Sequence, residues 1–187
     1  MTTNPISTTA TALPLAPGHW TLDPYHSSVG FTIRHLGISK VRGRFGQLEA
    51  ELSVGATTEE CTVTASIAMD SIDTGRSDRD KHVLAADMLD VRSRPTMAFR
   101  STRIRRDGTD WVMEGELTIG GVSRPVMFDV DFGGVAPPEA FDGHRHAGFE
   151  ATGEIRRSEF GLGFGAGDAL LGDVVKIQLD VQFVESE

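Results

Sequence analysis

The sequence predicts an all-β protein in which about eight antiparallel strands form one domain. Apolar and polar residues alternate along most of the chain, as they do in strands with one buried face. Turn signals such as Asp107-Gly108 separate the alternating segments. A chain of 187 residues suffices for one sizeable core and is short for two.

The alternation is clearest in seven segments. In the first, Val29, Phe31 and Ile33 share one face and polar residues occupy the other. The other six segments lie at 48–54, 61–69, 111–119, 126–132, 147–155 and 175–183. Shorter candidate strands lie at 19–23, 40–46 and 96–106. Antiparallel sheets of this kind close into a barrel or pair into a sandwich, and the alternation alone leaves both open.

Residues 77–89 depart from the alternation and predict one short helix. Val83, Leu84 and Met88 recur at helical spacing, and Ser77 is a suitable N-cap. This short helix is a candidate lid.

The chain ends and the overall charge exclude several classes of protein. Residues 1–17 are predicted to be a flexible tail before a domain at 18–187, and they lack the apolar run of a signal peptide or membrane span. We therefore expect a cytoplasmic protein without a transmembrane segment. The formal net charge of -9 argues against nucleic acid as a partner. A lone cysteine, Cys61, excludes an intrachain disulfide.

Several blocks of the sequence, in order, resemble the YceI-like family of lipid-binding proteins. They are WTLDPYHSSVGF at 20–31, RH at 34–35, GRF at 43–45, SIDTG at 71–75, RDKHV at 79–83, RPTMAF at 94–99, LTIGGVSRPV at 117–126, RSEFGL at 157–162 and GDVV at 172–175. The resemblance covers Gly18 to Val184 and implies a single lipocalin-like β-barrel whose interior takes a polyisoprenoid or another long amphiphile. An isoprenoid quinone and a polyprenyl phosphate both fit this expectation, for transport, storage or sensing. Many family members are exported to the periplasm, and this sequence differs from them in lacking a signal peptide.

The inward faces of the strands supply candidate contacts for an apolar tail. They are Val29, Phe31, Ile33, Val63, Ile67, Trp111, Met113, Phe128, Phe149 and Ile177. Composition alone leaves open whether these side chains surround a cavity or fill a core. For the head group we expect His26, His35 and His82, because imidazole can donate a hydrogen bond to a phosphate or carbonyl oxygen.

Some polar residues suggest functions other than lipid binding. Asp23, His26 and Ser27 could supply a small hydrolase, but neighbouring strand residues face opposite ways, and no nucleophile elbow, P-loop or dinucleotide fingerprint is present. We therefore expect neither catalytic residues nor a cofactor. His144 and His146 suggest a metal site, but no third ligand is visible in the sequence, so none is assigned. A homodimer is a further option.

Overall fold

The computed structural model describes residues 12–186, which fold into strands, short 3-10 helices and one α-helix. The strands are β1 (Gly18–Leu22), β2 (Ser28–His35), β3 (Ser39–Phe45), β4 (Leu48–Val54), β5 (Thr62–Ala68), β6 (Ile72–Asp73), β7 (Thr96–Asp107), β8 (Asp110–Ile119), β9 (Val122–Ala136), β10 (His146–Arg156) and β11 (Leu171–Glu185). The helices are η1 (Pro24–His26), η2 (Thr58–Glu60), η3 (Met69–Ser71), α1 (Ser77–Val83), η4 (Pro138–Ala140), η5 (Arg157–Phe160) and η6 (Gly165–Ala169).

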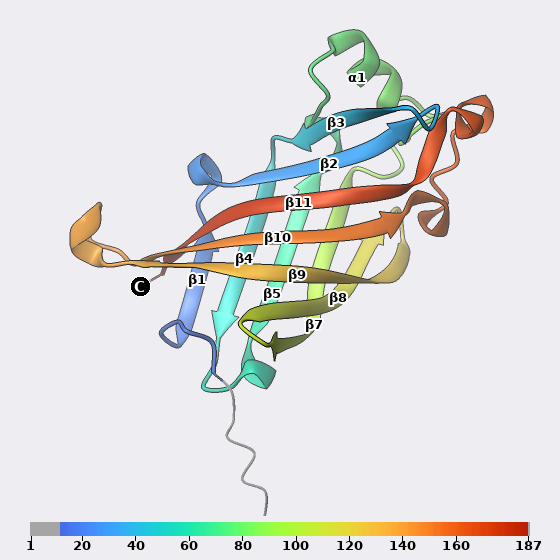
Figure 1. Ribbon diagram of the computed structural model, residues 1–187. Coiled ribbons are helices and arrows are strands. Elements are labelled where there is room, and N and C mark those ends of the chain that lie inside the picture. Colours follow the sequence, from blue (N-terminus) through green and yellow to red (C-terminus); the bar gives the residue numbers. More distant parts are fainter. Residues whose placement is uncertain (1–11, 187) are drawn as a thin grey trace, which may run out of the picture.

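Eight antiparallel strands close into a barrel, in the order β1-β4-β5-β7-β8-β9-β10-β11 (Figure 1). The long strand β11 closes the ring, because its C-terminal end pairs with β1 while residues 171–180 pair with β2. Strands β2, β3 and β6 therefore extend the sheet beyond the ring. The structure confirms the predicted antiparallel barrel of about eight strands.

The predicted turn at Asp107-Gly108 connects β7 to β8. Asp107 pairs with Asp110, which leaves Gly108 and Thr109 as the loop. Gly108 has φ +64°, a conformation that glycine adopts without steric cost. The turn chemistry read from the sequence therefore places this hairpin correctly.

The structure contains the predicted helix, but the helix is shorter than expected. It ends at Val83, whereas the helical spacing predicted a helix to residue 89. Beyond Val83 the chain continues in turns, with Asp90 at φ +47°, and Leu89 is buried in the core. The apolar residues of this segment are thus buried by turns rather than by a longer helix. Ser77 is not the N-cap: Arg76 holds that position without a side-chain hydrogen bond.

The packed part of the chain begins before Gly18, within the segment predicted as a tail. Leu15 is buried in the core, and the Trp20 indole donates a hydrogen bond to the Ala16 carbonyl. Residues 1–11 of the predicted tail lie outside the described residues. Among residues 12–186, no helix has the length and apolar character needed to cross a membrane.

Candidate ligand-binding cavity

A cavity of about 750 Å³ lies inside the barrel. Side chains of both hydrophobic clusters line it, including Trp111 of one and Phe128 of the other. This volume falls within the range of small-molecule sites. All ten side chains predicted for tail contact lie on its wall. Their part in binding stays a prediction.

The interior stays open where aromatic rings pack over glycines and where small residues face one another. The Phe31 ring covers Gly43 on the paired strand, so a Cβ at Gly43 would collide with it. Across β4 and β5, Ala50 is paired with Ala65, and both line the cavity. Without larger side chains at these positions, the wall leaves free volume that a filled core would not have.

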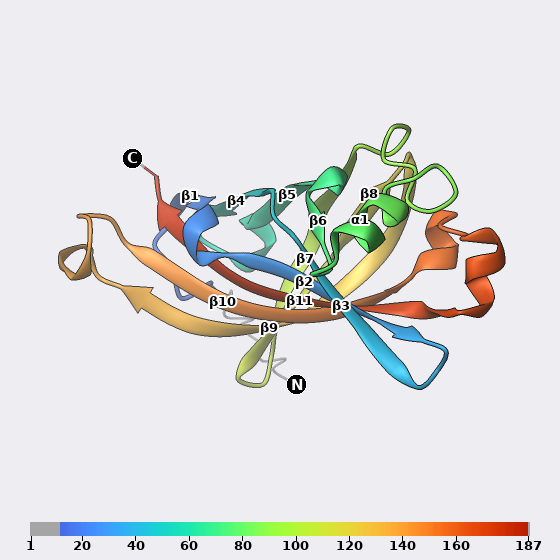
Figure 2. The ribbon, with the colours of Figure 1, turned by 90° about the horizontal axis from the view of Figure 1, so that it is seen from above.

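Polar side chains of the cavity wall are confined to one end, which we call the rim. The rim comprises His35, Ser39, Lys40, Thr74, Arg79, His82 and Arg157. These residues come from β2, β3, the segment from β6 into α1, and η5, and none of the described residues that line the cavity is an aspartate or glutamate. Seen from above, these elements lie at the same end of the barrel (Figure 2). The cavity is therefore apolar inside and polar and basic at one end.

Two of the three predicted head-group histidines lie at the rim. His35 is half-buried on the last residue of β2, and His82 is exposed on α1 with its Nε2 3.7 Å from Asp87 Oδ2. His26 does not line the cavity, because η1 directs it elsewhere. The structure thus brings His35 and His82 to one end of the cavity and separates His26 from them.

Arg157 organises the rim and was not predicted from the sequence as a site residue. Its guanidinium is buried, contacts Asp168 Oδ1 at 2.7 Å and donates to the carbonyls of Leu162 (2.8 Å), Leu171 (3.1 Å) and Gly172 (3.0 Å). A planar guanidinium can satisfy several acceptors at once. Arg157 therefore holds together the loop that carries η6. The sequence feature that could have indicated this residue is its position, directly after the alternating segment that forms β10.

Comparison with known proteins places the barrel in a family. The YceI-like domain matches residues 20–183 of this chain. The chain belongs to the YceI-like family. A UPF0312 protein of Staphylococcus aureus is 33% identical over 175 residues, which cover 90% of this chain and 99% of that protein. Protein YceI of Escherichia coli is 33% identical over 138 residues, which cover 73% and 71%.

Solved structures of YceI-like and related proteins share the fold. The Campylobacter jejuni YceI protein superposes with a TM-score of 0.71 and 26% identity, covering 100% of both chains. A polyisoprenoid binding domain from Saccharophagus degradans has a TM-score of 0.66 and 14% identity, covering 89% of this chain and 98% of that domain. The latter similarity concerns the fold.

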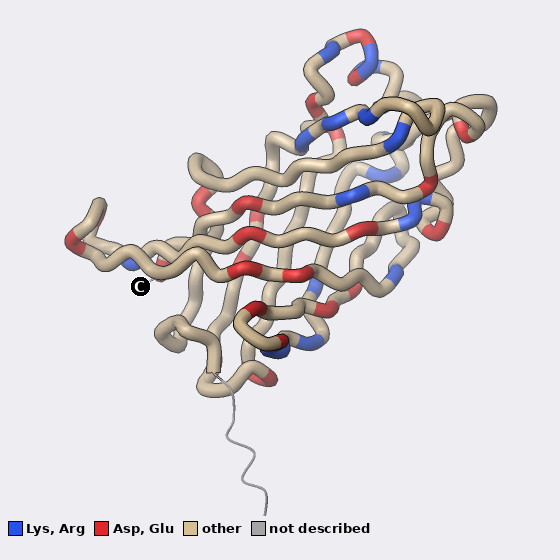
Figure 3. The backbone as a smooth tube through the Cα atoms, viewed as in Figure 1, with Lys and Arg blue, Asp and Glu red and all other residues tan. Residues whose placement is uncertain are grey.

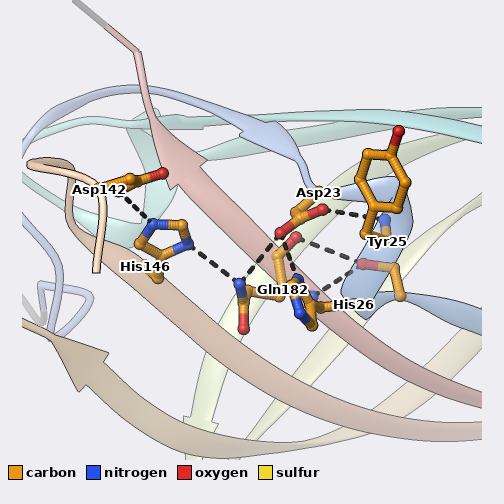
Figure 4. A network of polar contacts seen from close by, with 7 residues as sticks. Asp23, Tyr25, His26, Asp142, His146 and Gln182 are labelled. Carbon is orange, nitrogen blue, oxygen red and sulfur yellow. Dashed lines mark hydrogen bonds and ion pairs between the residues drawn. The ribbon is translucent and has the colours of Figure 1, made fainter. Parts of the chain in front are cut away.

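His26 of this YceI-like barrel belongs to a separate polar network, which ties η1 to the β10 and β11 strands (Figure 4). Its Nδ1 lies 2.7 Å from Asp23 Oδ2, and the Gln182 amide lies 3.2 Å from the same carboxylate. The Gln182 amide also lies 3.0 Å from His146 Nδ1, and His146 Nε2 lies 2.8 Å from Asp142 Oδ1. These contacts link Asp142, His146, Gln182, Asp23 and His26 in one series, so the network acts as a structural clamp.

The network also bears on the two rival functions. Asp23 and His26 do meet, but the Ser27 hydroxyl bonds to the Gln182 backbone instead of to His26. His146 is buried and bound to Asp142, and among residues 12–186 no group of three or more His, Cys, Asp or Glu is placed to hold a metal ion. Asp23, His26 and Ser27 are therefore not aligned as a hydrolase triad in this network.

Acid is expected to weaken this clamp. The hydrogen bond with His146 is the main cause that lowers the pKa of Asp142. For Asp23, burial acts to raise the pKa, but hydrogen bonds from the His26 side chain and the Tyr25 N–H outweigh it, so the pKa is lowered. Because both pKa values are lower in the folded state, the carboxylates stabilise the fold above the ordinary value of about 4. This stabilisation is lost as pH falls through that value towards the lower folded pKa.

The variant Asp142→Asn tests this expectation. Its free energy of unfolding, measured by urea denaturation, should fall less between neutral pH and pH of about 3 than that of the wild type. Asp131→Asn, on the outer face of β9, is the matched control. Its free energy of unfolding should fall between these pH values as much as that of the wild type. Equal pH dependence in both variants would count against the clamp.

Proposed function

We infer that this YceI-like barrel binds a long-chain isoprenoid amphiphile, with the tail in the cavity and the head group at the rim. The observation that carries the proposal is the distribution of polarity: the wall is apolar throughout, except at one basic end. An amphiphile has the same distribution. The function is binding, for transport, storage or sensing of the lipid, rather than catalysis.

The size of the hydrophobic effect makes such binding feasible. Each buried methylene contributes about 0.8 kcal/mol, so ten buried carbons offer roughly 8 kcal/mol before ordering costs. That value corresponds to a micromolar dissociation constant. A longer isoprenoid chain has a larger driving force, limited by the cavity volume.

The chemistry of the rim favours a head group that accepts hydrogen bonds. His35 and His82 offer N–H donors, and none of the described residues that line the rim is itself a carboxylate, while Asp168 is paired with Arg157. The carbonyl oxygen of an isoprenoid quinone and the phosphate of a polyprenyl phosphate are both such acceptors. The description of the Saccharophagus degradans domain as polyisoprenoid-binding supports the same ligand class.

The proposal predicts that affinity increases with chain length until the cavity is full. Prenyl alcohols of increasing length, delivered from cyclodextrin, are titrated into the protein by calorimetry. Each added buried carbon should tighten binding by about fourfold, and the affinity should then reach a plateau. Phe31→Ala enlarges the cavity and should move the plateau to a longer chain. Affinity that is independent of length in both proteins would overturn the proposal.

A further inference from the structure

An apolar tip projects beside the cavity rim. Residues Leu36, Gly37 and Ile38 connect β2 to β3, and the side chains of Leu36 and Ile38 are exposed, with Ile38 at 81%. Leu170, at the end of the η6 loop, is 45% exposed and lies next to them, because the Leu36 N–H donates to the Leu170 carbonyl at 2.7 Å. Figure 1 shows the β2–β3 hairpin and the η6 loop at the same corner of the barrel. Three large apolar side chains thus form one exposed group.

The backbone of this turn does not require a leucine. Leu36 has φ +54° and Gly37 has φ +72°, so both central residues lie in the left-handed region. Turns of this kind favour Asn, Asp or Gly, and a branched apolar side chain is disfavoured there. A leucine that is both strained and exposed contributes to neither the turn nor the core. Its side chain is therefore available for contact outside the chain.

Basic side chains lie directly behind the apolar tip. Residues 24–48 contain four Lys or Arg and no Asp or Glu, in a protein with a formal net charge of -9. Arg34 of β2 and Lys40 and Arg42 of β3 are exposed. The tube view shows basic positions gathered along these two strands (Figure 3). Among residues 12–186 none of these three forms an ion pair, whereas the fourth, Arg44, pairs with Asp73.

Protection of a sheet edge explains only part of this arrangement. Strand β3 is paired with β6 over two residues, so Lys40 and Arg42 lie where charges prevent edge-to-edge association. However, Arg34 pairs directly with Lys40, and like charges opposite each other destabilise a sheet. Edge protection also leaves Leu36 and Ile38 unexplained, because exposed apolar residues promote association. The combination fits a surface that is both apolar and anionic.

We propose that Leu36, Ile38 and Leu170, with Arg34, Lys40 and Arg42 behind them, form a docking tip for an anionic lipid bilayer. The apolar side chains would enter the headgroup region, and the cations would pair with anionic lipids. Leu170 also lines the cavity, so the apolar surface continues from the tip to the rim. Docking would then turn the cavity mouth towards the membrane, and this last step rests on the proposed lipid-binding function.

Vesicle flotation with the full chain tests the docking tip. On vesicles of phosphatidylcholine with about one third phosphatidylglycerol, wild-type protein should float, and added salt should weaken its binding. Ile38→Asp should bind at least about tenfold more weakly, because the side chain no longer gains from burial. Arg42→Ser should lose about fivefold on these vesicles and little on pure phosphatidylcholine.

The matched control is Met127→Asp, which replaces a residue 54% exposed on the outer face of β9, away from the tip. It should float like the wild type. Failure of wild-type protein to bind anionic vesicles, or equal losses in Ile38→Asp and Met127→Asp, would overturn the docking tip. Ile38→Asp should retain wild-type affinity for prenyl alcohols in the absence of vesicles, so failure of docking and failure of ligand binding are distinguishable.

Discussion

Ala65→Trp is expected to abolish prenyl alcohol binding while the barrel remains folded. Ala65 lies on β5, points into the cavity and faces Ala50 across the β4–β5 pair. An indole at this position occupies space that an apolar tail would need. Because the added side chain fills free volume instead of displacing packed atoms, the cost in stability should be small. Calorimetric titration should show at least a tenfold loss of affinity.

Ser66→Trp is the matched control for this variant. Ser66 is the next residue of β5, is exposed and points out of the barrel. The same indole there should leave the affinity for prenyl alcohols unchanged. If Ala65→Trp bound as tightly as Ser66→Trp, the ligand would lie outside the cavity.

Arg157→Ala is expected to lower the free energy of unfolding by about 3 kcal/mol. The substitution removes the ion pair with Asp168 and leaves carbonyls at the rim, including that of Leu162, without their donor. The figure is at the low end for a broken buried pair because the Asp168 side chain is 50% exposed and can be solvated. In a protein of this size the thermal midpoint should fall by about 10 °C. Urea and thermal denaturation measure both quantities.

Two neighbouring changes separate the role of Arg157 from a general effect of charge. Arg156→Ala removes an exposed arginine whose contact with Asp173 is 3.6 Å, and it should cost less than about 0.5 kcal/mol. Arg157→Lys keeps the charge but cannot reach the same set of acceptors, so it should recover less than half of the loss. A full recovery by lysine would contradict the account of the rim.

Most of the fold could be predicted, because alternation of apolar and polar residues is typical of one structure, a β-strand with one buried face. The segment at 175–183 follows it without a break, and the structure has it as part of β11. Alternation cannot show that one strand has three partners, and it is this property of β11 that closes the barrel and attaches β2. The predicted end of the helix was wrong for a related reason. Apolar spacing indicates that Leu84 and Met88 are turned towards the core, and turns half-bury them as a helix would.

The cavity wall was accessible to the same reasoning, whereas the rim was not. Residues such as Phe31 and Ile177 occupy the alternate positions of their strands that point inward, so the cavity wall follows from the fold. The direction of the His26 side chain could not be predicted, because residues of a short 3-10 helix do not alternate between two faces. Arg157 was missed because its partners are mostly backbone carbonyls, and only the folded loop brings these together.

Native mass spectrometry of freshly purified protein, with organic extraction of whatever co-purifies, tests the central claim most directly. We expect one long-chain isoprenoid amphiphile per protein molecule, or its uptake by an apo form when prenyl lipids are added. An apo mass that does not change on addition of prenyl lipids would contradict the claim that the cavity is a lipid-binding site.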